Sequence, residues 1–376
     1  MQVFCDNYVE NQALYHTFTE PLFLKPDGVR TRYPIGWNGY GRYLPNTLKV
    51  TYNGLPCNIS EESNGIWFNF DIAPGANTNY EDYTISYVAR PLDYAFSVGL
   101  PEGGYTGEEY FLFPNWNNAK GEGDGFWVGK WQASNNGSDI PQSKSNTTYL
   151  WAGITRDNAI NQCRAKGENF GMMRNRQWVS IALWCDHHEI YIKGNIYGGN
   201  TNNLDGDNTT LTQCGGGYHG GNGYHIVTGN TVPDTWSHNG KSGGIYNLNG
   251  NVWEFMDGIE NRGGEIWIYD ENGNYVDSGV SIAASVSGTG TQIKDISNTS
   301  EAILNEGISN IIDTQGYVPS NLKGDAMWNN NGGQNVLIRS GCSYYGLQCG
   351  LWTFSVLNPL SVSGWELCFR LTKDLE

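Results

Sequence analysis

Charged residues are scarce in this sequence, and bases are scarcer than acids. Only 16% of the 376 residues are charged, and 38 acids against 22 bases leave a formal net charge of -16. An acidic chain is repelled by the phosphates of nucleic acids and by the anionic headgroups of membranes. We therefore expect neither nucleic acid nor an anionic membrane surface as a partner.

Long apolar runs are also lacking. No stretch approaches the roughly 18 uninterrupted apolar residues that a membrane-spanning helix needs. Residues 1–10 are acidic and lack the basic and apolar parts of a secretory signal. The sequence predicts a protein without membrane insertion and without a secretory signal.

Closely spaced cysteine pairs are the third absence. None of the eight cysteines lies in a CxxC motif, so the sequence predicts neither a zinc site nor a thioredoxin-like redox centre. Without an export signal, buried free thiols are favoured over a disulfide framework. The cysteines are Cys5, Cys57, Cys163, Cys185, Cys214, Cys342, Cys349 and Cys368.

Glycine and aromatic residues are abundant instead, and their distribution suggests a domain boundary. The chain has 50 glycines, 23 tyrosines and 14 tryptophans, and twelve of the tryptophans follow residue 100. We predict an N-terminal arm over 1–35, a small β-sandwich-like module over 36–100 and a second, larger domain over 101–376.

Short-range patterns predict the elements of these regions. Apolar residues alternate over 48–52, 66–72 and 83–87, and Asn53-Gly54 is a strong hairpin signal. In the second region the alternation over 367–371 predicts a strand, whereas the segments 198–244 and 280–325 have the composition of loops.

Two helices are predicted by apolar residues at helical spacing. The first has Thr155 as its cap and places Ala159, Ile160 and Cys163 on one face. The second follows Asn175 and buries residues between Trp178 and Cys185.

Four motifs resemble those of a known family. Residues 243–255 read GGIYNLNGNVWEF, and Arg339-Ser340-Gly341-Cys342 is followed about thirty residues later by Cys368-Phe369-Arg370-Leu371. Together with residues 127–134 and 173–178, they resemble the formylglycine-generating-enzyme branch of the C-type lectin fold. The resemblance covers about 105–376 and implies an α+β, C-type-lectin-like domain preceded by a small antiparallel β module.

Four residues of these motifs are expected to be structural. Trp253 is a large apolar anchor for a loop-rich domain. Glu254, Arg339 and Arg370 lie on strands that should be neighbours, where one buried carboxylate–guanidinium pair would be satisfied. We expect these side chains to hold the scaffold and to take no part in catalysis.

The segment 339–370 is similar to the variable region of diversity-generating-retroelement proteins, which include receptor-binding proteins of phage tails such as the major tropism determinant. In that family, adenine mutagenesis of Asn-type codons readily yields Tyr, Ser, Leu, Val, Gly and Asn but not Trp, Glu or Gln. Gln348, Trp352, Trp365 and Glu366 therefore fit diversification less well. The predicted ligand-binding residues are Tyr344, Tyr345, Leu347, Gln348, Ser355, Leu357, Asn358, Val362, Gly364, Trp365 and Glu366.

Physical reasoning supports the same surface but leaves one question open. Loops rich in Tyr, Ser and Gly provide large rigid contacts together with adaptable hydrogen bonding. A place in the core and a place on the surface are both compatible with the sequence for Leu351, Trp352 and Phe354. The same alternative applies, with less weight, to Tyr344, Tyr345 and Trp365.

The resemblance implies a non-enzymatic protein that recognises a protein or glycan receptor on a target cell. It implies a location on the virion, at the phage tail, after assembly in the host cytoplasm, or on the cell surface if the protein is cellular. A homotrimer is compatible with it. No cofactor is expected, although a structural calcium ion would be compatible with the acid-rich loops.

Two alternatives use the same fold. An enzyme that generates formylglycine has two cysteines separated by four residues, whereas six residues separate Cys342 and Cys349. Iron-dependent sulfoxide synthesis needs histidines at metal spacing, which the six histidines lack. A calcium-dependent sugar lectin could use residues 205–208 (DGDN), but the Glu-Pro-Asn and Gln-Pro-Asp motifs of such lectins are missing.

Overall fold

The chain folds into a mixed α+β structure in which strands predominate. Two α-helices are present among the residues that the computed structural model describes. The described residues are 16–22, 26–35, 40–63, 65, 67–91, 107–114, 125–135, 139–145, 147, 149–187, 190–196, 213–219, 224–227, 232–240, 243–270, 272–282, 286–292, 325–329 and 332–374. The chain divides into two compact units, Met1–Leu100 with Phe111–Trp116, and Pro101–Tyr110 with Asn117–Glu376.

Unit 1 consists of two small antiparallel sheets. The described strands of the first sheet run in the order β1-β8-β4-β5, with β3 also paired to β8, and those of the second run β2-β7-β6. The elements are β1 (His16–Pro21), β2 (Arg32–Pro34), β3 (Tyr40–Tyr43), β4 (Lys49–Tyr52), β5 (Leu55–Pro56), β6 (Ile59–Glu61), β7 (Trp67–Phe70), the 3-10 turn η2 (Tyr80–Asp82) and β8 (Tyr83–Pro91).

The predicted hairpin is present. Asn53 and Gly54 both have positive φ angles, 47° and 80°, which is the conformation a tight two-residue β turn requires. They connect β4 to β5, and Tyr52 pairs with Leu55 across the turn. The alternation at 83–87 is also confirmed, since Tyr83, Ile85 and Tyr87 are all buried on β8.

Two parts of unit 1 differ from the sequence expectation. Residues 1–35 were expected to form an arm, but β1 pairs antiparallel with β8 and β2 pairs with β7. Their weak alternation concealed them, because short edge strands need few apolar residues. The second difference is Ile72, which is 83% exposed and lies beyond Phe70, the last residue of β7.

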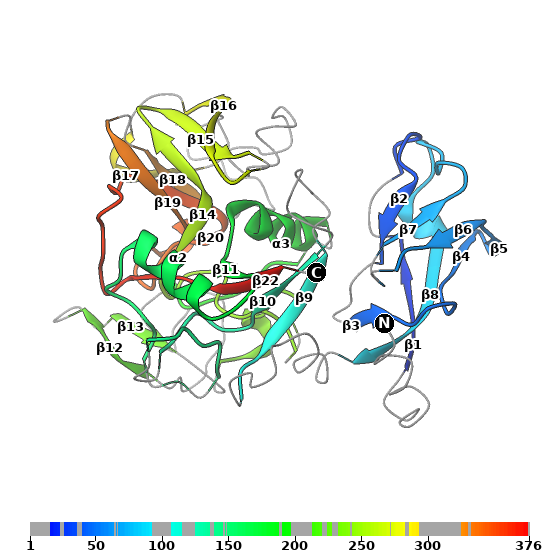
Figure 1. Cartoon of the computed structure of the whole chain (residues 1–376), viewed down its shortest axis with the longest axis horizontal. Helices are drawn as coiled ribbons and strands as arrows, with labels where there is room; N and C mark the ends of the chain where they lie inside the picture. The colour runs from blue at the N-terminus through cyan, green and yellow to red at the C-terminus, as the bar shows by residue number, and fades with distance from the viewer. Residues whose placement is uncertain are drawn as a thin grey trace. The chain divides into compact units, whose positions relative to one another are not determined.

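Unit 2 contains both α-helices and the largest of the described sheets (Figure 1). Figure 1 shows the β15–β16 and β12–β13 hairpins at opposite ends of the unit. Strand β9 (Tyr110–Pro114) begins in unit 2 and continues in the segment of unit 1 that starts at Phe111. The other elements are β10 (Gly125–Gly129), α2 (Arg156–Ala165), β11 (Phe170–Met172), α3 (Asn175–His187), β12 (Gln213–His219), β13 (Tyr224–Val227), η4 (Asp234–Trp236), β14 (Trp253–Arg262), β15 (Glu265–Tyr269), β16 (Tyr275–Ser281), β17 (Val286–Gln292), β18 (Ala326–Asn329), β19 (Gln334–Ser340), η5 (Gly346–Gln348), β20 (Gly350–Val356), β21 (Leu367–Cys368) and β22 (Leu371–Asp374).

Both predicted helices are confirmed. Thr155 caps α2, since its side chain accepts a hydrogen bond from the Asn158 backbone N–H. The face carrying Ala159, Ile160 and Cys163 is buried, as the spacing predicted. In α3 the buried residues include Trp178, Val179, Ile181, Ala182 and Cys185.

The strands of the largest sheet run in the order β16-β15-β14-β19-β20-β18-β17 among the described residues. Strand β14 is central to it, because β15 and β19 flank it and the short strand β21 joins it in parallel. A second sheet runs β11-β22-β10-β9. The last strand in the chain, β22, therefore lies between two strands that come much earlier in the sequence.

Two segments predicted as loops contain strands. The segment 198–244 includes the β12–β13 hairpin, and 280–325 includes β17. The predicted strand over 367–371 is divided between β21 and β22, and all five of its side chains are buried. Alternation predicts that every second side chain faces solvent. Here both sets of alternate side chains are buried, and the charged Arg370 is paired inside the core.

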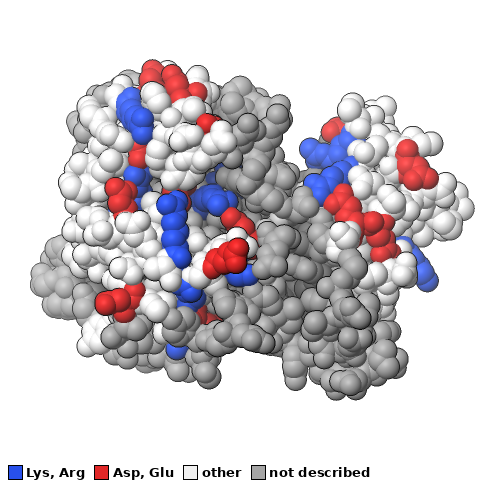
Figure 2. Space-filling model, viewed as in Figure 1, with Lys and Arg blue, Asp and Glu red and all other residues white. Residues whose placement is uncertain are grey.

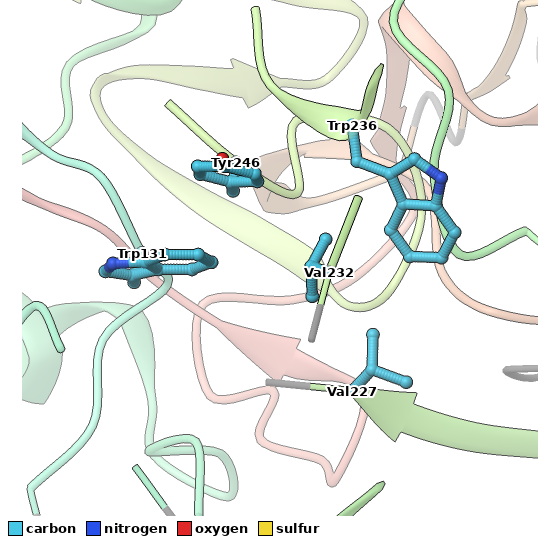
Figure 3. Close-up of a cluster of buried hydrophobic side chains, with 5 residues drawn as sticks. All are labelled: Trp131, Val227, Val232, Trp236 and Tyr246. Carbon is cyan, nitrogen blue, oxygen red and sulfur yellow. The ribbon is translucent and has the colours of Figure 1, made fainter. Parts of the chain in front are cut away.

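A cluster of buried side chains packs where loops converge in unit 2 (Figure 3). Trp131 and Tyr246 stack with their ring planes 10° apart and their centroids separated by 4.4 Å. Lys130 lies 5.9 Å from both ring centroids and forms an ion pair with Glu109 over 2.9 Å. Val227, Val232 and Trp236 complete the cluster.

Charged side chains are sparse on the described part of the face drawn in Figure 2. In Figure 2, the acidic and basic side chains on the face in view are scattered in small groups over an otherwise uncharged surface. Within the described part of the chain, no helix is long and apolar enough to cross a membrane.

Candidate ligand-binding face

The scaffold beneath the predicted face is fastened by a buried ion pair between Arg370 and Glu254. Both side chains are fully buried, and Arg370 Nη2 and Nε donate to the two carboxylate oxygens over 2.6 and 3.0 Å. The remaining donors of Arg370 reach the backbone carbonyls of Gly129, Lys130 and Tyr246. All five N–H groups of the guanidinium are thereby satisfied, which makes its burial tolerable.

Arg339 is buried as predicted, and it donates hydrogen bonds to Asn175 and to the backbone of Trp352. Its Cα lies opposite that of Glu254 in the β14–β19 register. Its Nε donates to Asn175 Oδ1 over 2.8 Å, and Nη1 donates to the Trp352 carbonyl over 3.4 Å. Thus Arg370 forms the expected carboxylate pair, while Arg339 connects β19 to α3 and β20.

The GNVWE motif forms a tight turn whose positive φ angles and close contacts favour glycine and asparagine. Asn251 has a φ of 68°, and its side-chain amide exchanges hydrogen bonds with the backbone of Val227, the Asn195 amide and the Gln132 amide. A Cβ at Gly250 would overlap the Asn195 carbonyl. The motif thereby ties three separate segments together below β14.

Five aromatic side chains form a cluster, named here the aromatic cluster, that rises from the core to the surface. Trp253 and Trp328 form its buried base, at 5.4 Å between ring centroids. Tyr345 lies 5.6 Å from Trp253 and 5.0 Å from Trp328. The Tyr344 ring is tilted by 33° against that of Tyr345, with 4.6 Å between the centroids, and lies 6.0 Å from Trp365; these three residues are half-buried.

The upper part of the aromatic cluster carries a polar contact. The Tyr344 hydroxyl donates to Glu366 Oε2 in a short hydrogen bond. Burial, the nearby Cys342 and this bond raise the pKa of the Tyr344 phenol, while burial raises the pKa of Tyr345 to about 12. Both tyrosines therefore remain neutral hydrogen-bonding groups at physiological pH.

A short turn, η5, presents the most exposed residue of the predicted set. Leu347 is 45% exposed and Gln348 is half-buried. Gly346 begins the turn with a φ of 61°, and its N–H donates to the Ile196 carbonyl over 3.0 Å. The turn is thus held by the scaffold while it displays Leu347.

Strand β20 decides the question of core against surface. Trp352 and Phe354 are buried, and Leu351 is half-buried. Ser355 is only 4% exposed, so this predicted binding residue does not lie on an exposed face. The reason is that β20 runs between β19 and β18, and Trp178 of α3 donates from Nε1 to the Leu351 carbonyl over 2.7 Å.

The remaining predicted residues follow β20 in half-buried turns. Leu357 follows the last residue of β20, the Asn358 carbonyl accepts from the Val336 N–H, and the Gly364 carbonyl accepts from the Gly153 N–H. The Val362 N–H donates to the Pro359 carbonyl and closes a turn. Ring contacts and a hydrogen bond join Tyr344, Tyr345, Trp365 and Glu366. Leu357, Asn358 and Val362 lie instead in the turns that follow β20.

Sequence reasoning missed Trp328 as part of the site. It lies on β18, immediately after the segment 280–325 that was predicted to be a loop. The four residues 326–329 are all buried, so they show no alternation that would identify a strand. The apolar triplet Ala326-Met327-Trp328 between polar stretches was the available signal.

The cysteines near the site are poorly suited to nucleophilic chemistry. The six described cysteines are free, and burial raises the pKa of both Cys342 and Cys349. The Cys349 thiol donates to the Cys342 carbonyl over 3.2 Å. Among the described residues, no three His, Cys, Asp or Glu side chains gather as a metal site, and the candidate calcium segment 205–208 lies outside those residues.

A scan against protein-family models and a search of curated proteins find no match to this chain. The side chains of the face itself are therefore the basis for proposing a ligand.

Proposed function

We propose that this chain is a ligand-binding protein of C-type-lectin-like fold, in which the aromatic cluster and the η5 turn recognise a receptor on a target cell. The proposed setting is host recognition by a phage tail, with a protein or glycan as the receptor. The proposed face comprises Tyr344, Tyr345, Leu347, Trp365 and Glu366. No catalytic step and no cofactor are part of the proposal.

One observation carries the proposal. The Tyr344 and Tyr345 rings contact each other at 4.6 Å, and Tyr345 rests on two buried tryptophans, yet both tyrosines remain half-buried. Aromatic groups that are already fixed lose little conformational entropy on binding, so they make effective contact residues. Their exposed parts are available to a ligand.

The neighbouring groups support the same interpretation. Leu347 offers an exposed apolar contact beside the cluster, and Glu366 and the tyrosine hydroxyls offer hydrogen-bonding groups. Binding faces commonly combine aromatic anchors with adaptable polar groups in this way. The face is carried by short turns attached to β19, β20 and β21, which is how a rigid scaffold supports variable side chains.

The test measures binding of the fluorescently labelled full chain to a panel of intact bacterial isolates by flow cytometry. We expect selective binding that the double variant Tyr344→Ala/Leu347→Ser lowers by roughly tenfold or more, since anchor residues contribute about 2 kcal/mol each. Tyr149→Ala is the matched control, because Tyr149 is 53% exposed and has none of these contacts. Binding that both variants retain equally would contradict the proposed face.

The test also requires that the variants stay folded. The double variant lacks the hydrogen bond between Tyr344 and Glu366. The thermal melt of the double variant is therefore compared with that of Tyr344→Phe, which lacks the same hydrogen bond but retains the ring. Loss of binding in Tyr344→Ala/Leu347→Ser with a melt close to that of the wild type would support recognition by this face. A collapse of the melt in Tyr344→Phe as well would show that the hydroxyl is structural.

A further inference from the structure

A small, partly open hollow lies between α3 and the start of β20. Ala182 and Ile192 line it from the side of α3 and the loop that follows, and Leu351 and Trp352 line it from β20. Tyr191 also lines it, together with the amide residue Asn249 and the carboxylate residue Asp325. The hollow thus combines apolar walls with an amide and a carboxyl group.

Asn249 presents an acceptor that nothing in the described chain uses. Its side chain is 2% exposed, and its Nδ2 donates to the Ile192 carbonyl over 2.8 Å, which fixes the orientation of the amide. Within the described segments, no donor reaches its Oδ1 atom. A buried carbonyl oxygen left without a partner costs free energy, so a ligand that donates to it gains that amount.

Asp325 supplies the second oxygen group. It is 4% exposed, and its Oδ2 accepts from the Trp352 backbone N–H over 2.7 Å. Burial raises the pKa of this carboxyl well above its usual range, and backbone N–H groups of Trp352, Thr353 and Asp325 itself, together with the positive charge of Arg339, partly oppose that effect. A cation inside the hollow would stabilise the ionised carboxylate further.

A glycine makes room for this carboxylate. A Cβ at Gly350 would overlap both Asp325 oxygens, so no other residue fits at the first position of β20. Gly350 has no positive φ that would itself require glycine. The close approach therefore explains this glycine, and it holds the Asp325 carboxylate at the start of the strand.

We infer that this hollow binds a small primary ammonium compound, whose N–H groups donate to Asp325 and to Asn249 Oδ1 while its short alkyl part lies against Leu351 and Ile192. The two polar groups offer acceptors, so a ligand with hydrogen-bond donors and a positive charge matches them. A divalent cation would need about six to eight oxygen ligands, far more than two side chains supply. An anion would meet a carboxylate.

Protonation and binding are coupled at this site. Ammonium binding requires ionised Asp325, so the affinity should rise as the pH rises toward the raised pKa of that carboxyl. The other ionisable groups here are Arg339, whose guanidinium stays charged, Tyr191, which lines the hollow, and Cys349, whose pKa burial raises. Asp325 is the carboxyl among them, so it determines the dependence.

The experiment titrates the full chain with methylammonium and ethylammonium chloride, at constant ionic strength, by calorimetry and by thermal melting. Tetramethylammonium chloride, which has no N–H donors, and neutral acetamide are the control probes. We expect saturable binding and a raised melting temperature with the primary ammonium ions alone. Asp325→Asn keeps the acceptor for Trp352 but removes the charge, and it should weaken binding by roughly tenfold or more.

A second variant keeps the inference testable if Asp325→Asn does not fold. Ala182→Val fills the wall of the hollow with two methyl groups and should also abolish binding. The inference is overturned if the wild type shows no saturable response to either ion, if tetramethylammonium acts equally, or if both variants bind like the wild type. Because the aromatic cluster is untouched, cell binding by these variants remains a separate measurement.

Discussion

Replacing Arg370 by Met tests whether the buried ion pair holds unit 2 together. Methionine has a similar length and is apolar, so the packing volume is largely retained while all five hydrogen bonds are lost. Glu254 would remain as a buried charge without its counterion, with the Gln132 amide still donating to it over 3.0 Å. Breaking a buried pair from one side costs about 3–5 kcal/mol.

That loss is large against the total. Domains of ordinary stability unfold with about 5–15 kcal/mol, so Arg370→Met should remove a fifth or more of the free energy of unfolding of unit 2. The control is Arg164→Met, whose guanidinium is 58% exposed and lies 3.6 Å from Asp257. A pair with an exposed guanidinium and so long a contact contributes about 1 kcal/mol or less.

The assay is urea unfolding followed by tryptophan fluorescence, because twelve of the fourteen tryptophans follow residue 100. The double variant Arg370→Met/Glu254→Met should regain part of the loss, since the stranded charge is then gone. If Arg370→Met unfolds at the same urea concentration as Arg164→Met, the pair is not what stabilises the domain. If the double variant is less stable than the single one, the unpaired carboxylate is not the source of the loss.

Three further predictions follow from other parts of the structure. Asn251→Ala removes four side-chain hydrogen bonds and places alanine at a φ of 68°, so it should cost roughly 3 kcal/mol or more in the same urea assay; a loss below that of Arg164→Met would refute it. The pKa of Tyr345 is raised from 10.0 to about 12, so the stability it contributes is complete below pH 10 and is lost as the pH rises toward 12. Tyr345→Phe should therefore show a smaller decline over that range, and an equal decline would contradict the raised pKa. Incubation with a cysteine-containing sulfatase peptide, with or without copper, should give no aldehyde, because burial raises the pKa of Cys342 and Cys349; turnover that disappears in Cys342→Ser would refute this.

Local signals in the sequence identified the elements that depend on local interactions. The helix cap at Thr155, the turn at Asn53-Gly54 and the buried stripes of both helices need only neighbouring residues, and all three are present. The burial of Arg339 and Arg370 was also predictable, because both lie in motifs on strands expected to be neighbours, and a buried charge there needs a partner. Which carboxylate each one meets depends on strand register, so the partners of Arg339 were not predictable.

The candidate site was harder to predict for the same reason. Ser355 is a residue type that fits a variable binding position, yet it is buried on β20, which lies between β19 and β18 inside the sheet. Trp328 supports the aromatic cluster from a strand whose four side chains are all buried, so alternation could not reveal it. The hollow at Asp325 joins segments far apart in the sequence, and no local pattern brings them together.

The position of β22 has a consequence for synthesis. Residues Leu371–Asp374 fill the space between β11 and β10, and Arg370, just before them, closes the ion pair with Glu254. While these residues are still inside the ribosome, β10 and β11 have no strand between them and Glu254 has no counterion. Unit 2 can therefore close only after translation has passed Asp374, and until then its apolar interior is available to chaperones. A nascent chain stalled before Arg370 should accordingly be cleaved by protease within unit 2, whereas one carrying an added C-terminal linker long enough to bring Asp374 out of the ribosome should resist.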